Sequence, residues 1–117
     1  MDRAALEEVP SLNTVLNALD DVDCRTILRE TADPTPAAEL ADACGIPRST
    51  LYRKLELLTD ASLVRERETI NPGGGRTTKY ERDMEGVTVA LDADDEFSVT
   101  VERPSRDADD RIVDTTW

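Results

Sequence analysis

The segment PAAELADACGIPRSTLYRKLELLTDASLVRER spans residues 36–67 and holds the clearest structural pattern in the chain. Thr35 is expected to cap a helix that begins at Pro36 and ends at Gly45. A tight turn over residues 45–47 follows. Another helix follows the turn and ends near Asp60. The positions expected to face inward are Leu40, Ala41 and Cys44 before the turn and Leu51, Leu55 and Leu58 after it. Two short helices joined by such a turn are typical of a helix-turn-helix.

Two further helices are predicted upstream of this segment. Apolar residues at helical spacing predict one over residues 11–20, and Asp21 is placed to cap the next. Asp33-Pro34 ends that helix, because proline restricts the residue before it and lacks an N–H. The apolar positions are Leu12, Val15, Leu16 and Leu19 in the first of these helices and Val22, Ile27 and Leu28 in the second.

The hydrophobic period changes after the helices. Residues 64–70 alternate as a strand, residues 71–75 form a glycine-rich turn, and residues 77–82 return as the partner strand. A second strand pair flanks the acidic turn 92–96. Its facing apolar residues are Val87, Val89 and Leu91 against Phe97, Val99 and Val101.

These elements predict an α+β fold, a winged helix-turn-helix with three to four helices, a β-hairpin wing and a second, C-terminal β-hairpin. We expect a winged-helix DNA-binding domain with an N-terminal helix over residues 1–85, a hairpin appendage over 86–103 and an acidic, loosely ordered tail over 104–117. Three roles stay open for the appendage: it extends the wing sheet, builds a dimer interface or forms a platform for a partner.

The charge of the chain is unevenly distributed. The 117 residues include 26 acidic and 14 basic residues and no histidine, for a formal net charge of −12. Residues 47–82 reverse this balance with eight basic and five acidic side chains, a net charge of +3. Bulk acidity argues against a general nucleic-acid coat, whereas one basic segment suits a localised contact with DNA.

The type of charged residue is also biased. Of the 14 basic residues 12 are arginine, and aspartate supplies 15 of the 26 acids. Such a composition suits a surface that stays hydrated in concentrated salt, and it predicts a halophilic archaeal source; ordinary acidic solubility is the alternative. No run of 18 apolar residues predicts a membrane span, and the acidic N-terminus is unlike a signal peptide, so we expect a cytoplasmic protein.

The segment 36–67 resembles the helix-turn-helix of winged-helix transcription regulators of the ArsR-like group. Upstream, LDDVDCRTILRE at residues 19–30 is similar to the helix that precedes the motif in those proteins, and the glycine-rich turn is similar to their wing. The resemblance covers residues 19–82. It implies a sequence-specific transcription regulator that binds double-stranded DNA.

The resemblance also implies which residues contact DNA. Those expected to contact base edges in the major groove are Arg48, Ser49, Thr50, Tyr52 and Arg53. Lys54 is expected on the phosphate backbone, and Arg76 and Lys79 of the wing on the minor groove or phosphates. An alternative role for Tyr52 is packing against the wing.

The chain departs from the family pattern in two places. Pro47 stands where a side-chain cap often begins the recognition helix, and it only presets φ. Glu66 and Glu68 lie on the first wing strand, where a surface facing DNA disfavours acids. Alternation places Arg65 and Arg67 on the other face of that strand, and we expect these two arginines to pair with nearby glutamates.

The sequence gives little support for metal binding, redox chemistry or catalysis. Cys44 is expected to be a small core residue, and Cys24 to be partly exposed, with a thiol switch as the alternative role. No set of soft ligands predicts a metal site, and no cofactor is expected. Without histidine the usual general base is missing, so we expect no catalysis.

A homodimer completes the prediction. Leu6 and Val9 add apolar side chains near the first helix, and a dimer spaces two recognition helices about one DNA turn, ~34 Å, apart. The rival hypothesis is a winged-helix protein-interaction module that docks on transcription machinery without direct contact to DNA bases. The discriminating feature is whether the basic side chains of residues 47–82 are open or neutralised by carboxylates. Nothing in the sequence identifies a small-molecule effector.

Overall fold

The computed structural model of the chain describes residues 11–104. Within them the fold is an α+β winged helix-turn-helix, with helices α2 (Leu12–Asp20), α3 (Val22–Glu30), α4 (Ala37–Cys44) and α5 (Arg48–Asp60). The strands are β1 (Thr35–Pro36), β2 (Val64–Ile70), β3 (Arg76–Arg82), β4 (Gly86–Leu91) and β5 (Phe97–Glu102). The predicted helices and both hairpins are therefore confirmed. Leu6, Val9 and all of the predicted tail except Pro104 lie outside the described residues.

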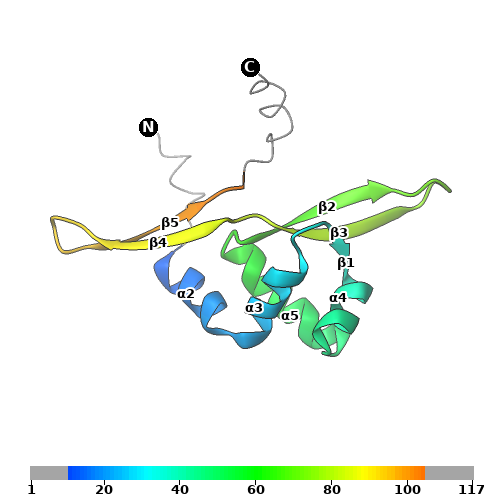
Figure 1. The fold of residues 1–117 in the computed structure, drawn as a ribbon, viewed down its shortest axis with the longest axis horizontal. Coiled ribbons are helices and arrows are strands. Elements are labelled where there is room, and N and C mark those ends of the chain that lie inside the picture. Colours follow the sequence, from blue (N-terminus) through cyan, green and yellow to red (C-terminus); the bar gives the residue numbers. More distant parts are fainter. Residues whose placement is uncertain (1–10, 105–117) are drawn as a thin grey trace, which may run out of the picture.

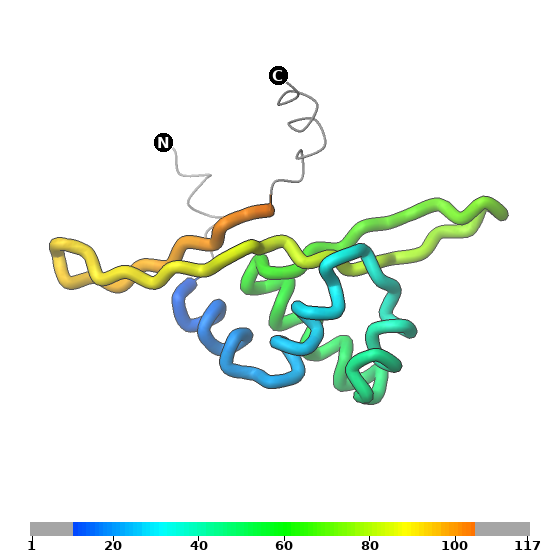
Figure 2. The backbone as a smooth tube through the Cα atoms, viewed as in Figure 1, coloured from blue at the N-terminus to red at the C-terminus, as the bar shows by residue number. Residues whose placement is uncertain are grey.

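The helices pack together on one side of the strands (Figure 1). Strand β3 continues through a short connection into β4, so the two hairpins extend toward opposite ends of the molecule (Figure 2). β1, β3 and β2 form one antiparallel sheet, in which Glu66 lies opposite Tyr80. β4 and β5 form a separate two-stranded sheet that shares no ladder with the wing sheet.

Side-chain caps fix the first two helices. The hydroxyl of Ser11 accepts the backbone N–H of Thr14 at 3.1 Å, and Oδ1 of Asp21 accepts that of Cys24 at 3.0 Å. The predicted cap at Asp21 is confirmed. These bonds satisfy amide groups that have no partner inside their helix.

The predicted start of the third helix is wrong by one position. Pro36 is the N-cap of α4, without a side-chain cap, and the Thr35 hydroxyl donates to the carbonyl of Asp33 at 2.8 Å. The reason is long-range pairing, because Thr35 and Pro36 are extended as strand β1 against Tyr80 and Lys79 of β3. At the other end, Gly45 has a φ of +70°, the left-handed conformation that glycine adopts without strain.

One hydrophobic core joins the helices to the base of the wing. Its largest fully buried apolar side chains are Ile27, Leu40, Leu51, Leu58, Leu63 and Val15. Val22 and Leu16, predicted on the apolar faces of their helices, are 62% and 42% exposed. Cys24, predicted to be partly exposed, is buried, whereas Cys44 is half-buried and packs against the core. The Cys24 side chain points toward α5, where its Sγ lies 3.8 Å from the carbonyl oxygen of Lys54.

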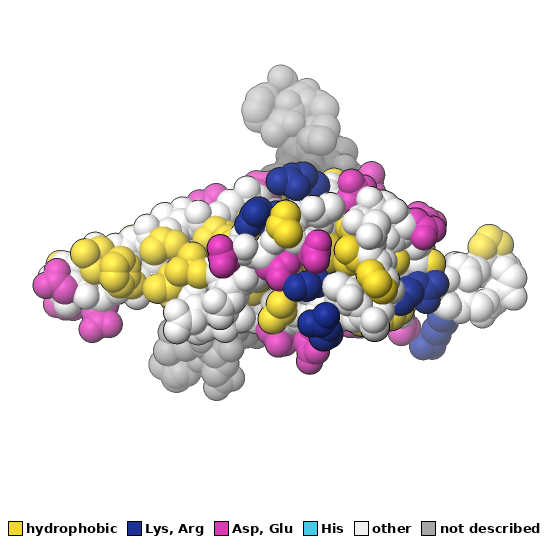
Figure 3. All heavy atoms as spheres, turned by 90° about the horizontal axis from the view of Figure 1, so that it is seen from below, with side chains coloured by type: hydrophobic (Ala, Val, Ile, Leu, Met, Phe, Trp, Pro, Cys, Tyr) yellow, Lys and Arg dark blue, Asp and Glu magenta, His cyan; other side chains and the backbone are white. Residues whose placement is uncertain are grey.

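The second hairpin is attached at its base and exposed toward its tip. Val87, Val99 and Val101 are half-buried against the core, whereas Leu91 and Phe97 are exposed. Figure 3 shows apolar side chains gathered along this hairpin, with acidic side chains at its end. No helix among residues 11–104 has the length and hydropathy needed to cross a membrane.

Candidate nucleic-acid interface

Helix α5 presents a polar face because its apolar face is fully occupied. Leu51, Leu55 and Leu58 are buried in the core, which fixes the rotation of the helix about its axis. The exposed residues on its first two turns are Arg48, Ser49, Tyr52 and Arg53. Four of the five residues predicted to contact base edges thus lie at the surface of one helix end, and Thr50 is half-buried beside them.

The start of α5 has no side-chain cap. Pro47 is the N-cap residue, and no side chain accepts a hydrogen bond from the first turn. Uncapped amide groups and the helix dipole together attract an anion, such as a phosphate oxygen of a nucleic-acid backbone. The departure from the family pattern at Pro47 is therefore compatible with a phosphate contact at this end of the helix.

Lys54 lies apart from the other predicted contacts. Its Nζ is 2.6 Å from Oδ2 of Asp21, the residue that caps α3. This hydrogen bond lowers the pKa of Asp21 and raises the pKa of Lys54, since each charge favours the other. The geometry gives no support to a phosphate contact from Lys54, which stays a prediction.

The wing places Arg76 and Lys79 on opposite faces. Alternation along β3 puts Arg76 on the face of Tyr80 and Lys79 on the other. Arg76 Nη1 lies 3.2 Å from Oε1 of Glu68, and both side chains are well exposed. Because a pair of this kind is weak in water, Arg76 can leave it for a phosphate at small cost.

The two arginines of β2 form the predicted pairs. Arg65 and Arg67 both reach Oε1 of Glu81, at 3.1 and 3.4 Å. All three side chains lie on one face of the hairpin, as strand alternation requires. The expectation that these arginines pair with glutamate is confirmed.

The basic segment is partly neutralised and partly open. Four of its eight basic side chains form ion pairs: Lys54, Arg65, Arg67 and Arg76. Arg82 donates to the carbonyl oxygen of Leu28 at 3.2 Å. Within residues 11–104 no carboxylate pairs with Arg48, Arg53 or Lys79. Figure 3, seen from the helical side, shows basic and acidic side chains interspersed over the helices.

The two thiols are poorly suited to redox chemistry. Burial raises the pKa of Cys24 to about 12, with the charge of Asp21 adding to the effect. Burial also raises the pKa of Cys44, followed by the charge of Glu30. Thiols that stay protonated are slow nucleophiles and poor metal ligands. In the described part of the chain no three His, Cys, Asp or Glu side chains come together as a metal site.

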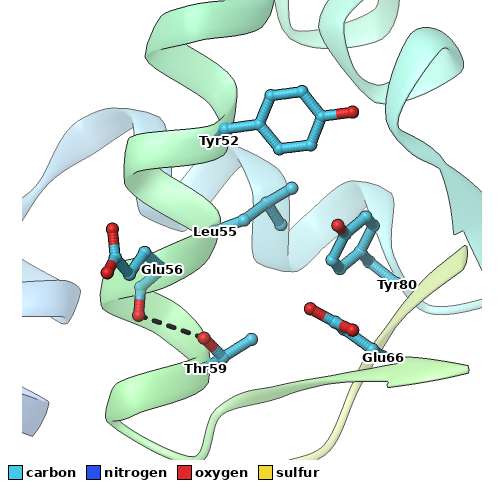
Figure 4. Close-up of a pocket in the computed structure, with 6 residues that line it drawn as sticks. All are labelled: Tyr52, Leu55, Glu56, Thr59, Glu66 and Tyr80. Atoms are coloured by element: carbon cyan, nitrogen blue, oxygen red, sulfur yellow. Dashed lines mark hydrogen bonds between the residues drawn. The ribbon is translucent and has the colours of Figure 1, made fainter. Parts of the chain in front are cut away.

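The sequence interpretation missed a cleft between α5 and the wing. Tyr52, one of the predicted contacts, lines it together with Tyr80 of β3, as Figure 4 shows. Tyr52 is 47% exposed and also borders the wing across this cleft, while its contact with DNA stays a prediction. The available signal was Tyr80, the one aromatic residue in the two wing strands.

One family model agrees with the helix-turn-helix part of the fold. Residues 19–67 match the family model described as a helix-turn-helix domain. No curated protein matches the chain. Among solved structures it is similar to a possible transcriptional regulator from Methanosarcina mazei Go1, with 19% sequence identity and a TM-score of 0.46. That similarity covers 60% of this chain and 62% of the other chain, so the matched part is less than two thirds of the other chain.

Proposed function

We propose that this protein is a sequence-specific DNA-binding transcription regulator whose helix α5 enters the major groove. The observation that carries the proposal is the exposed, unpaired state of Arg48 and Arg53 within residues 11–104, on a helix with an uncapped N-terminus. Arginine forms bidentate hydrogen bonds with guanine, and Ser49, Thr50 and Tyr52 add further donors and acceptors beside it. The helix-turn-helix match over residues 19–67 supports the same function.

Phosphate contacts position the helix in this proposal. The free amide groups at the start of α5 provide one contact, and Arg76 and Lys79 of the wing provide others on two sides of the hairpin. Lys54 contacts a phosphate only if its ion pair with Asp21 breaks. The large acidic remainder of the chain weakens binding to arbitrary DNA, because it repels phosphate wherever α5 is not engaged.

A second copy of the chain is part of the proposal. The β4–β5 hairpin leaves Val89, Leu91 and Phe97 exposed on one face, and an isolated two-stranded hairpin is marginally stable. Packing of two such faces about a two-fold axis covers apolar surface on both copies. A standard interface buries ~800 Å² per partner, and we expect exposed Leu16 of α2 to contribute to it beside the hairpin.

We also infer an ArsR-like regulator from a halophilic archaeon, on the sequence resemblance and on the excess of aspartate over lysine. In a cytoplasm with molar salt, charges are screened within ~3 Å. Close fit of α5 to base edges then has to replace long-range attraction. No effector is assigned by this argument.

The experiment compares Arg53→Ala with Arg67→Ala, a matched control whose guanidinium already pairs with Glu81. Fluorescence anisotropy is measured on the DNA upstream of the gene and on scrambled DNA of the same composition. Arg53→Ala is expected to lose about 1–3 kcal/mol of site preference, and Arg67→Ala almost none. Equal loss on both DNAs for Arg53→Ala rejects its role as a base contact.

The alternative is a protein-interaction module, and one observation favours it. Half of the basic side chains of residues 47–82 are already neutralised by carboxylates, which leaves less positive surface than the sequence suggests. Absence of any selective DNA binding by the wild-type chain, at low and at high salt, is the result that this alternative predicts.

A further inference from the structure

The direction of the β4–β5 hairpin is not set by the wing sheet. The hairpin forms a sheet of its own, and only residues 83–85 connect β3 to β4. At its base, Val87, Val99 and Val101 pack against the core. Apolar contact of this kind holds two surfaces together but is non-directional. Hydrogen bonds, which have a preferred geometry, therefore have to fix the angle at which the hairpin leaves the helices.

Arg103, the residue directly after β5, forms such bonds. Its Nη1 donates to the carbonyl oxygens of Ser62 and of Asp83, the latter at 2.9 Å. The same nitrogen lies 3.5 Å from Oδ2 of Asp83. Nη1 carries two N–H groups, so each carbonyl can accept one of them. Within residues 11–104, the bond to Ser62 is the only hydrogen bond that joins residues 86–104 to residues 11–82.

Ser62 is a rigid anchor because it is fastened to the last turn of α5. The chain turns there with a φ of +62°. The N–H of Ser62 donates to the carbonyl of Thr59 at 3.0 Å, and the N–H of Leu63 donates to that of Leu58 at 2.9 Å. Leu58 and Leu63 are fully buried. The bond from Arg103 thus holds the end of β5 to the end of the proposed recognition helix.

The connection between the two hairpins is held at the same place. The N–H of Asp83 donates to the carbonyl of Leu63 at 2.8 Å, directly beside Ser62. Figure 2 shows β5 running back from the tip of the second hairpin to the middle of the molecule, where β3 passes into β4. The ends of α5, β3 and β5 therefore meet at one guanidinium group.

We propose that Arg103 is a positioning residue that fixes the direction of the β4–β5 hairpin relative to α5. Resting on the proposed function, the consequence is a fixed distance between the two recognition helices of the dimer, because the second copy packs on this hairpin. Arg103 itself does not touch DNA. The dimer then selects one spacing of half-sites, since a change of one base pair moves a half-site by ~3.4 Å and turns it by roughly 35°.

The first test measures the direction of the hairpin in the absence of DNA. Residual dipolar couplings of the backbone amides are compared between the wild type and Arg103→Ala. In the wild type, one alignment tensor is expected to fit the helices and the hairpin together. In Arg103→Ala the hairpin couplings should shrink and fit only a tensor of their own. A common tensor retained in Arg103→Ala overturns the proposal.

Arg25→Ala is the matched control for this measurement. Arg25 is also exposed, and its Nη1 donates to the carbonyl oxygen of Leu19 at 2.7 Å. The variant therefore removes the same charge and the same kind of bond away from the hairpin, and it should keep the common tensor. The side chain of Arg103 is 40% exposed, so both variants are expected to fold, and circular dichroism checks this. Loss of the common tensor in Arg25→Ala as well overturns the assignment.

The second test measures the choice of half-site spacing. Anisotropy titrations use duplexes with two half-sites at different spacings and a duplex with one half-site. The wild type is expected to prefer one spacing by about 10-fold over its neighbours, and Arg103→Ala by less than about 3-fold, with equal affinity of both proteins for the single half-site.

The outcomes separate positioning from a general loss of structure. An unchanged spacing preference, or an equal weakening on every duplex, overturns the role of Arg103, because damage to the fold lowers affinity for the single half-site too. A wild type that binds all duplexes alike rejects the proposed function and the spacing claim with it. The dipolar couplings, which need no DNA, still decide whether Arg103 fixes the hairpin.

Discussion

Asp21 joins two helices of the domain, and its substitution separates two contributions to stability. Oδ1 accepts the amide of Cys24 at the start of α3, and Oδ2 accepts Nζ of Lys54 on α5. Asp21→Ala removes both contacts. Asp21→Asn keeps a cap of nearly equal strength and removes only the charge, so the pair of variants isolates the cap from the ion pair.

The expected magnitudes follow from the exposure of the groups. Loss of an aspartate cap costs about 1 kcal/mol, which lowers the melting temperature of a domain of this size by about 5 °C. The ion pair adds little, because both side chains remain partly in contact with water, at 17% for Lys54 and 23% for Asp21. Asp21→Asn is therefore expected to lie close to the wild type and well above Asp21→Ala.

The pH dependence of stability tests the same contact. The hydrogen bond from Lys54 holds the pKa of Asp21 below its ordinary value of 3.8. The folded state thus binds this proton less readily than the unfolded chain, so the stabilisation is complete above that value and is lost as pH falls through the lower folded pKa. The small advantage of the wild type over Asp21→Asn should disappear in that acid range.

Thermal unfolding followed by circular dichroism measures all three proteins in parallel. An Asp21→Asn variant as unstable as Asp21→Ala would refute the reasoning, because the cap would then contribute nothing. Asp21→Asn also releases Lys54. If Lys54 is the phosphate contact that the sequence predicts, freeing its ammonium group raises DNA affinity. The slope of log affinity against log salt concentration then becomes steeper by about one released counterion.

Three other expectations concern packing and backbone. Leu58 is fully buried and Leu57 beside it is 40% exposed. In urea unfolding, Leu58→Ala should therefore lower the free energy of unfolding by about 3 kcal/mol and Leu57→Ala by less than about 1 kcal/mol. Similar losses would contradict the assigned rotation of α5. Cys44 should react with a thiol reagent well before Cys24, whose pKa of about 12 keeps it protonated, and equal rates by mass spectrometry would contradict its burial. A Cβ on Gly45 would meet open space, so Gly45→Ala changes stability only through the strain of its positive φ. We expect a loss of about 1 kcal/mol in the free energy of unfolding, and no loss in the same urea assay would contradict the positive φ.

Local patterns were enough to predict the four described helices and both hairpins, but not strand β1. The leucine spacing of α5, the cap at Asp21, and the glycine-rich turn between β2 and β3 are all encoded within a few residues of where they act. The errors arose where distant segments decide. Thr35 becomes part of a strand only because β3, more than 40 residues later, offers it a free edge.

The burial of Cys24 and the Lys54–Asp21 ion pair also depend on segments that are distant in the sequence. Cys24 is buried because α5 packs over it, and helical spacing within α3 alone does not reveal that contact. The pair of Lys54 with Asp21 spans 33 positions, and it removes from the open basic surface a residue that the family pattern assigns to DNA. Arg48, Ser49, Tyr52 and Arg53 are exposed as predicted, and no carboxylate within residues 11–104 pairs with the two arginines.

The central claim is that the surface of α5 recognises a specific DNA sequence. Selection of the full chain against a random duplex library, at low salt and at about 2 M potassium chloride, tests it most directly. The account predicts enrichment of one motif at both salt concentrations, arranged as two half-sites about one helical turn apart, and loss of that enrichment in Arg53→Ala. A pool that shows no enriched sequence at either salt concentration would contradict it.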